Sequence, residues 1–369
     1  MSIFGFAGPA PAATGIVNSA PHLHSAGGVT VALSGGPVWL GGRALERPAE
    51  ALLEAYRASG DAFLSTLTGR FALAVVDEPR RRALLALDRM GIERLAYGTR
   101  GDTLVFGHSA ADVARSLAPD PRLRPQALFD FLLLHMVPAP GTVFEGVHKL
   151  RPGTCARFES GRIRVERYWQ PAFTRDGSAP FQPLREALLA ALRDGVAACR
   201  PDEHTGAFLS GGLDSSTVAG MLGEVSGRPP RTFSIGFGVD EFNELDYARI
   251  AARRFRAEPH EYDVTADDVV DAFLRIAGAF DEPFGNSSAL PSYFCARLAR
   301  EHGVTHLLAG DGGDELFGGN ERYAKQKVFE AWWRLPGVLR SGILGPLAAR
   351  IHPASRVTPL RKLRSYVDQ

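Results

Sequence analysis

The stretch GAFLSGGLDSST, residues 206–217, is the feature that most constrains how this chain can fold. A short apolar run leads into Ser210-Gly211-Gly212, and a helical pattern follows at once. Similar apolar runs, at TGAFLS, RTFSIGF, HEYDV and THLLAG, alternate with helical patterns through the second half of the chain. This alternation predicts a doubly wound parallel sheet with helices on both faces.

The Ser-Gly-Gly segment has the composition of a loop that holds phosphate. Ligands of doubly wound sheets bind beyond the carboxyl ends of the strands, where loops lead into helices. Glycines let the backbone approach an anion, and the helix N-terminus offers free N–H groups and a positive dipole end. Ser210, Ser215 and Ser216 add hydroxyl donors. The alternative is a plain turn in which Asp214 only caps the helix.

Acidic side chains follow two of the expected strands, which suggests a metal ion. Asp214 would repel a polyphosphate unless a cation lay between them, so its position predicts Mg²⁺. A second acidic segment, LLAGDGGDELFGG at 307–319, sets Asp311, Asp314 and Glu315 among glycines. We expect at least one of these carboxylates to share the magnesium with Asp214, because like charges repel without a cation. A solvated acidic turn is the alternative for this segment.

The first half of the chain has the pattern of an antiparallel sheet. Short β-rich runs between residue 28 and about 170 are separated by turn signals, among them Glu78-Pro79 and Gly101-Asp102. Helices are expected over residues 48–60 and 126–136. The segment 171–183 is rich in Pro, Gly and Ser and predicts a linker. We therefore expect two domains, at 1–170 and 184–369.

Composition limits the partners of the chain. The 369 residues carry 42 basic and 41 acidic side chains, a formal charge of +1, which argues against nucleic acid. Neither a leader nor an apolar stretch long enough for a membrane span is seen, and the three cysteines lack paired spacing. We expect a cytoplasmic protein that acts on small molecules. His22 and His24 are interpreted as loop residues, because no third metal ligand has suitable spacing.

At these motifs the sequence resembles the asparagine synthetase family. LSGGLDSS resembles its pyrophosphate loop, TFSIGF its adenine-side strand, DEPFGNSSALPSY its carboxylate-side segment and GDGGDELFGGNERY its second signature. LDRMGIERLAYGTRGDTLVFGHSAADV, GVHKLRPG and RYW resemble its amino-terminal half. The resemblance implies an Ntn-hydrolase-like αββα sandwich of the glutamine amidotransferase type 2 class, followed by a PP-loop domain of the adenine nucleotide alpha-hydrolase-like fold.

The same resemblance implies a reaction and the residues that serve it. ATP would adenylate a carboxylate and release pyrophosphate, and ammonia or an amine would then form the amide. Asp214 and Asp314 would hold Mg²⁺, and Asp311 would act in catalysis. The remaining ATP-binding positions would be Phe208, Leu209, Ser210, Gly211, Gly212, Ser215, Ser216, Ile235, Ala309 and Gly310. Because Asp311 stands where asparagine-forming members commonly have glutamate, the acceptor stays open. Aspartate is the default, and the alternatives are a substrate like those of lasso-peptide cyclases and β-lactam synthetases, or a polysaccharide precursor.

Two departures from the family pattern qualify this reading. The start, MSIFG, lacks the amino-terminal cysteine of the glutaminase half, so Ser2 occupies the position of a vestigial nucleophile. We therefore expect a degenerate glutaminase domain, with ammonia or an amine as donor. Lys325, Lys327 and Lys362 do not match the family's carboxy-terminal lysine, so we expect a truncated synthetase domain. A non-catalytic nucleotide-binding protein remains the rival class, and a homodimer is left open.

Overall fold

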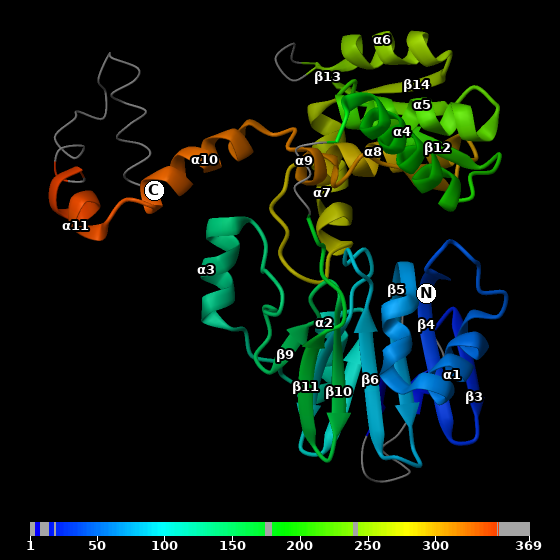
Figure 1. The fold of residues 1–369 in the computed structure, drawn as a ribbon, viewed down its shortest axis with the longest axis vertical. Coiled ribbons are helices and arrows are strands. Elements are labelled where there is room, and N and C mark those ends of the chain that lie inside the picture. Colours follow the sequence, from blue (N-terminus) through cyan, green and yellow to red (C-terminus); the bar gives the residue numbers. More distant parts are fainter. Residues whose placement is uncertain are drawn as a thin grey trace. The chain divides into compact units, whose positions relative to one another are not determined.

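The structure is a computed structural model that describes residues 4–7, 15–17, 20–173, 179–238, 243–344 and 346. The chain divides into two compact units, which are described separately (Figure 1). The first unit contains Met1–Glu186 and Val264–Tyr293, and the second contains Ala187–Asp263 and Phe294–Gln369. A segment from late in the sequence thus belongs to the first unit.

The first unit is built mainly from antiparallel strands. Its strands are β1 (Phe4–Ala7), β2 (Gly15–Val17), β3 (His22–Ala26), β4 (Val29–Trp39), β5 (Leu67–Asp77), β6 (Arg82–Leu87), β7 (Ala96–Arg100), β8 (Thr103–Gly107), β9 (Val147–Lys149), β10 (Thr154–Glu159) and β11 (Arg162–Arg167). Its helices are α1 (Pro48–Ser59), a 3-10 helix at Gly60–Thr66, α2 (Ala110–Leu117), α3 (Pro125–Leu134) and α7 (Ala266–Gly278). Helix α4 (Phe181–Ala198) begins in this unit, inside the segment expected as a linker, and α8 (Ala289–Glu301) ends in the second unit.

Two stacked sheets with a helix outside each form the predicted αββα sandwich. One sheet has the order β2-β1-β8-β7-β9 and the other β11-β10-β6-β5-β4-β3. Between them lies a fully buried core that includes Leu85 and Phe106. Helix α1 packs Leu52 and Leu53 on the outer face of the six-stranded sheet, and α2 packs Val113 on the outer face of the other. The fold class expected for this half is confirmed.

Local turn signals determine the hairpins. The turn at 78–81 joins β5 to β6, and Gly101-Asp102 joins β7 to β8, as predicted. The prediction for His22 and His24 is wrong, because both lie in edge strand β3 and not in a loop. Their backbones pair with Leu33 and Val31 of β4, which extends the sheet beyond what local composition indicated.

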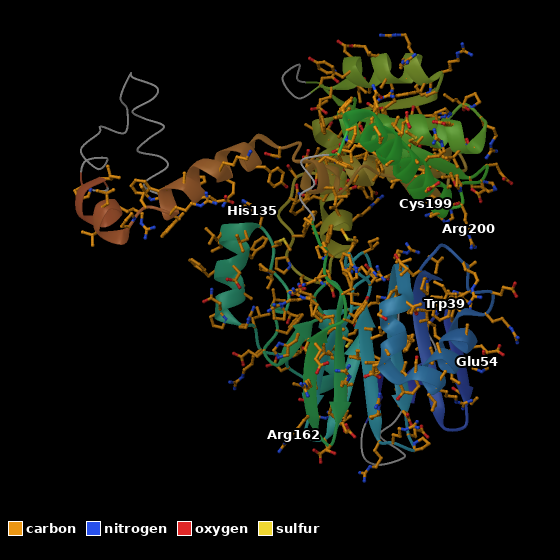
Figure 2. All side chains as sticks on the ribbon, in the orientation of Figure 1. Trp39, Glu54, His135, Arg162, Cys199 and Arg200 are labelled. Atoms are coloured by element: carbon orange, nitrogen blue, oxygen red, sulfur yellow. The ribbon has the colours of Figure 1, made fainter. Side chains whose placement is uncertain are left out.

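Two adjacent carboxylates attach the segment after α7 to the sandwich. Asp281 accepts a hydrogen bond from the N–H of Ala110, at the start of α2 (2.7 Å), and pairs with Arg94 (3.2 Å). Glu282 accepts from the N–H of Val143 (2.9 Å) and pairs with the ammonium of Lys149 (2.5 Å). The N–H of Gly285 then donates to the carbonyl of His135, the residue labelled beyond α3 in Figure 2 (2.7 Å). These contacts explain why 264–293 joins the first unit.

The second unit is an α/β domain. Its strands are β12 (Thr205–Phe208), β13 (Arg231–Phe237), β14 (Glu258–Val264) and β15 (His306–Leu308). Its helices, besides parts of α4 and α8, are α5 (Leu213–Ser226), α6 (Leu245–Phe255), α9 (Gly313–Phe317), α10 (Glu321–Trp333), α11 (Gly337–Leu339) and a π-helical turn at Arg340–Leu344. Each apolar run expected as a strand is a strand.

The sheet of the second unit has a switch point at β12. The strand order is β14-β13-β12-β15, and β12 runs parallel to both β13 and β15. Helices α4, α5 and α6 contribute to an apolar cluster on one face, and α8 packs Cys295 and Leu298 on the other. The chain therefore winds in both directions from β12, and the doubly wound fold is confirmed. In such sheets ligands bind where the winding direction changes, between β12 and β15.

The structure also bears on membranes. No helix in the described part of the chain combines the length and the apolar composition that crossing a bilayer requires.

A matched pair of substitutions tests the sandwich core. Phe106→Ala should lower the free energy of unfolding by about 3–5 kcal/mol, because Phe106 is fully buried between the sheets. Phe129→Ala on α3 is the control, since Phe129 is 59% exposed, and it should change stability by less than about 0.5 kcal/mol. Urea unfolding followed by circular dichroism measures both variants. Equal losses would contradict the assigned core.

The Glu282 and Lys149 ion pair should be energetically coupled. Glu282→Gln leaves the part-buried Lys149 ammonium without its carboxylate, and should lower the free energy of unfolding by roughly 1–3 kcal/mol. Lys149→Met in the same chain should recover part of this loss, with a coupling energy above about 0.5 kcal/mol in a double-mutant cycle. Glu145→Gln, on the exposed surface of the same unit, is the control. Strictly additive losses would refute the pairing.

Candidate functional site

The loop after β12 is held in place from its first residue. The N–H of Leu209 donates to the carbonyl of Phe233 in β13 (3.0 Å), and the carbonyl of Leu209 accepts from the hydroxyl of Ser234 (2.6 Å). Leu209 itself is buried. The apolar run therefore anchors the loop in the core and leaves the following polar residues at the end of the sheet.

Serine hydroxyls and glycine backbone shape the rest of this loop. Ser210 Oγ lies 3.0 Å from Ser215 Oγ, and the N–H of Gly212 donates to Ser210 Oγ (3.3 Å). Gly212 is the N-cap of α5 and offers no side chain to the first turn. The N-terminal N–H groups of this 14-residue helix are thus not satisfied by a capping side chain. Such a helix end attracts anions.

Gly211 is required by its surroundings. Its φ is +85°, in the region that favours glycine. A Cβ at this position would lie 2.5 Å from the N–H nitrogen of Ala248 in α6 and would also collide with Tyr247. Tyr247 is 67% exposed beside the loop. The sequence indicates only a helical pattern here, and the position of Tyr247 beside the loop was not predicted.

The loop after β15 packs directly on Asp214. A Cβ at Gly310 would lie 2.8 Å from the Cβ of Asp214 and 2.9 Å from the backbone nitrogen of Ser215. A methyl group at Gly313 would collide with the Asp214 carboxylate itself. The two acidic loops, about 100 residues apart in sequence, are therefore in contact at the switch point. The glycines create the room that the carboxylate occupies.

Within the described residues, no basic side chain pairs with the carboxylates at this contact. In the stretches that the structure describes, the carboxylates of Asp214, Asp311, Asp314 and Glu315 form no ion pair or hydrogen bond with another side chain. Asp311, Asp314 and Glu315 are exposed, and Asp214 is half-buried. Over the same stretches, no group of three or more His, Cys, Asp or Glu side chains is placed to hold a metal. The residues fit a cation that takes one or two carboxylates and completes its shell with water or phosphate.

The expected nucleotide-side residues lie around the same sheet edge. Phe208 and Ile235 are half-buried and pack against the α8 cluster, and Leu209 belongs to the cluster on the other face. Ala309 is exposed just after β15. The structure thus brings the predicted positions of β12, β13 and β15 to one end of the sheet. Ser2 and Lys362 lie outside the described residues.

Comparisons with known proteins were made for the whole chain. Residues 187–368 match the family model described as asparagine synthase, and residues 46–169 match the model described as glutamine amidotransferase domain. The asparagine synthase match contains both acidic loops, and the glutamine amidotransferase match contains most of the sandwich.

Similar curated proteins carry asparagine synthetase names. Two are a putative glutamine-hydrolysing asparagine synthetase of Mycobacterium tuberculosis, 34% identical over 304 residues, and asparagine synthetase 1 of Bacillus subtilis, 30% identical over 304 residues. The alignments cover 79% and 80% of this chain, and 46% of each relative. The chain therefore spans about half the length of the curated relatives it matches.

Solved structures give weaker likenesses. The allosteric regulatory enzyme of purine biosynthesis matches with 16% identity and a TM-score of 0.27, over 70% of this chain and 64% of that one. A TM-score of that size does not establish a shared fold. The family models and the curated relatives agree with each other, and the chain belongs to the asparagine synthetase family, with a glutamine amidotransferase domain followed by an asparagine synthase domain.

Proposed function

We propose that this protein is an ATP-dependent amide-forming ligase that releases AMP and pyrophosphate. The observation that carries the proposal is the contact between the Asp214 carboxylate and the glycines of the second acidic loop. It sets negative charge that no described side chain balances beside a helix N-terminus without a side-chain cap, at the switch point of the sheet. That combination suits a polyphosphate held partly by backbone N–H groups and partly through a divalent ion.

The residues of the first loop would bind the leaving group. Backbone N–H groups at the start of α5 and the hydroxyls of Ser210, Ser215 and Ser216 would donate to the β- and γ-phosphates. An oxygen of the acceptor carboxylate would attack the α-phosphorus, and the bond from that phosphorus to the β-bridging oxygen would break. Pyrophosphate would leave, and the nitrogen of ammonia or an amine would displace AMP from the acyl carbon. Donors fixed before the reaction lower its barrier by stabilising the charge that develops.

Asp214 and Asp314 would hold the magnesium ion. When bound, Mg²⁺ neutralises the charge that builds up on the departing pyrophosphate. Asp311, on the exposed loop before α9, would face the acceptor side. Its side chain is one methylene shorter than the glutamate that asparagine-forming members commonly carry. Aspartate is our first candidate acceptor because the similar curated proteins are named asparagine synthetases, and the change at Asp311 makes a larger substrate with a carboxylate the second.

The amidotransferase half would act as a scaffold. The names of the relatives include glutamine hydrolysis, whereas the family resemblance assigns the nucleophile position to Ser2 and not to a cysteine. A serine hydroxyl is a weaker nucleophile than a thiolate at neutral pH. Free ammonia or an amine would therefore replace glutamine as the nitrogen source in the reaction we propose.

Pyrophosphate exchange tests the proposed role of Asp214. With aspartate as acceptor, the wild-type protein should exchange labelled pyrophosphate into ATP. Asp214→Asn should slow exchange by about 100-fold or more, because loss of an electrostatic contact to the reacting centre costs that much in other enzymes. Asp194→Asn on the exposed face of α4 is the matched control and should exchange normally. Equal exchange by both variants would remove Asp214 from the site.

A glycine substitution tests the contact between the two loops. Gly313→Ala inserts a methyl group where the Asp214 carboxylate lies, and should weaken binding of ATP in the presence of Mg²⁺ by about tenfold or more. Gly195→Ala is the control, because nothing lies within 4 Å of a Cβ at that position of α4. Isothermal titration calorimetry measures both. Unchanged ATP affinity in Gly313→Ala would show that this contact is not part of the nucleotide site.

A further inference from the structure

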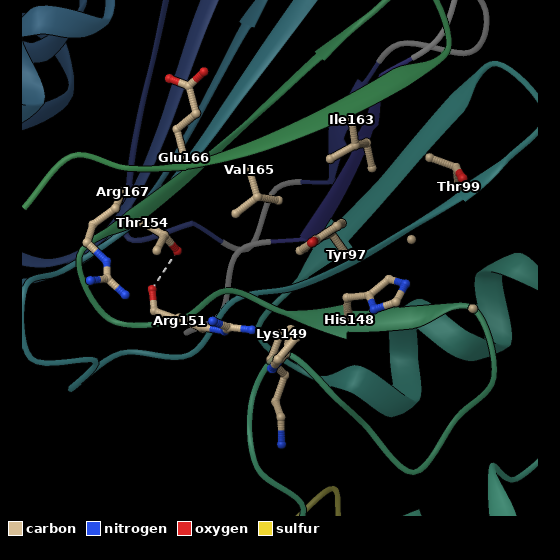
Figure 3. A pocket seen from close by; sticks show the side chains of 13 residues that line it. Tyr97, Thr99, His148, Lys149, Arg151, Thr154, Ile163, Val165, Glu166 and Arg167 are labelled. Atoms are coloured by element: carbon tan, nitrogen blue, oxygen red, sulfur yellow. Dashed lines mark hydrogen bonds between the residues drawn. The ribbon is translucent and has the colours of Figure 1, made fainter. Parts of the chain in front are cut away.

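A cavity of about 670 Å³ opens along one side of the amidotransferase-type sandwich (Figure 3). It lies where the edge strand β9 and its neighbour β7, from the five-stranded sheet, meet β10 and the edge strand β11 of the other sheet. Its size falls in the range of small-molecule sites. In the five-stranded sheet, β8 and β7 separate β1 from β9. The cavity is therefore apart from the strand that follows Ser2, and it lies wholly in the first unit.

One part of the cavity wall is apolar. Ile163 and Val165 reach it from β11, and Tyr97 from β7. Val165, on the edge strand β11, is 47% exposed and so is accessible to a ligand. The rings of Tyr97 and His148 are in tilted contact, with centroids 5.7 Å apart. These side chains offer a surface for a flat or aliphatic group.

Arg151 and Arg167 line another part of the cavity. Thr154 Oγ1 donates to the carbonyl of Arg151 (2.6 Å), which fixes the turn between β9 and β10. Thr154 is also the cross-strand partner of Arg167 in the β10–β11 pairing. Figure 3 shows Arg151, Thr154 and Arg167 grouped on one side, with Tyr97 and Ile163 further along the cavity. The strand pairing therefore places the backbone of Arg167 beside Thr154, whose hydroxyl is bonded to the carbonyl of Arg151.

The other charges in the lining are already neutralised. Lys149 pairs with Glu282 and also donates to the carbonyl of Val137 (2.9 Å). Glu166 pairs with Arg157 and with Arg164 (2.7 Å), and its side chain points away from Arg151 in Figure 3. The hydrogen bond from Arg157 holds the pKa of Glu166 below its usual value, so this carboxylate stays ionised and paired.

Positive charge therefore remains at Arg151 and Arg167. Across the described ranges neither guanidinium is in an ion pair, and Arg167 makes one hydrogen bond, to Gln170 Oε1 (2.9 Å). The loss of water around His148 and the charge of Arg124 lower the pKa of His148, so its ring adds a neutral hydrogen-bonding group at pH 7. A guanidinium group recognises a carboxylate or a phosphate through two parallel hydrogen bonds.

We propose that this cavity binds a small molecule that joins one oxyanion group, a carboxylate or a phosphate, to an apolar body. The oxyanion is held by Arg151 and Arg167, and the apolar body lies against Tyr97, Ile163 and Val165. This inference does not depend on the proposed ligase activity, because none of these residues belongs to the second unit.

Probe binding to the whole chain tests the site. Phenyl phosphate and phenylacetate are titrated by calorimetry at low salt, and the head group that binds more tightly identifies the oxyanion. Arg151→Met and Arg167→Met should each weaken the better probe by about tenfold or more, because hydrogen bonds to charged groups are strong. Val165→Asp should also weaken it, by adding a negative charge to the apolar wall. Arg162→Met, at the tip of the β10–β11 hairpin in Figure 2, is the control and should bind as the wild type does.

Three results would overturn the proposal. Binding of inorganic phosphate as tight as that of phenyl phosphate would mark a basic surface without an apolar subsite. Arg162→Met could weaken binding as much as Arg151→Met, which would mean that general charge is responsible. Absence of binding by both aromatic probes to the wild-type protein would also refute it. Thermal unfolding midpoints of all variants, compared with wild type, separate loss of the site from loss of the fold.

Discussion

The packing of Asp214 against the backbone of the second acidic loop is the constraint on which the candidate site depends. Only glycine at Gly310 and Gly313 leaves room for this carboxylate. The contact brings like charges of two loops toward each other without a cationic side chain among the described residues nearby. A fold does not gain stability from such an arrangement. The arrangement is understandable if the missing positive charge comes with the ligand.

Topology makes this contact possible. The two loops follow β12 and β15, which are neighbours in the sheet although about 100 residues separate them in the chain. After β12 the chain forms β13 and then β14 on one side of β12. It then returns through α8 and forms β15 on the other side of β12. The loops are therefore forced together at the end of the sheet, and small residues in both allow close approach.

The strands and hairpin turns could be predicted from the sequence because they depend on neighbouring residues. The capping box of α7 is equally local. In that box Thr265 Oγ1 accepts from the N–H of Asp268 (3.2 Å), and the Asp268 carboxylate accepts from the N–H of Thr265 (2.9 Å). The meeting of the two acidic loops was also predictable, because the strand and helix pattern implies their common edge.

Features that depend on distant partners were not predictable. The attachment of 264–293 to the first unit rests on Asp281 and Glu282, whose partners Arg94 and Lys149 lie more than 130 residues earlier. Nothing in the local composition around DEPFG indicates those partners. The strand at His22 is a similar case, because pairing with β4 and not its own residues makes it a strand. The cavity between β9 and β11 likewise depends on how two sheets meet.

A crystal structure of the protein with magnesium and a non-hydrolysable ATP analogue tests the central claim most directly. The account predicts an ion about 2.1 Å from a carboxylate oxygen of Asp214, in contact with the β- and γ-phosphates at the start of α5. It would be contradicted by phosphates bound elsewhere on the sheet, or by an Asp214 carboxylate that contacts neither an ion nor the nucleotide.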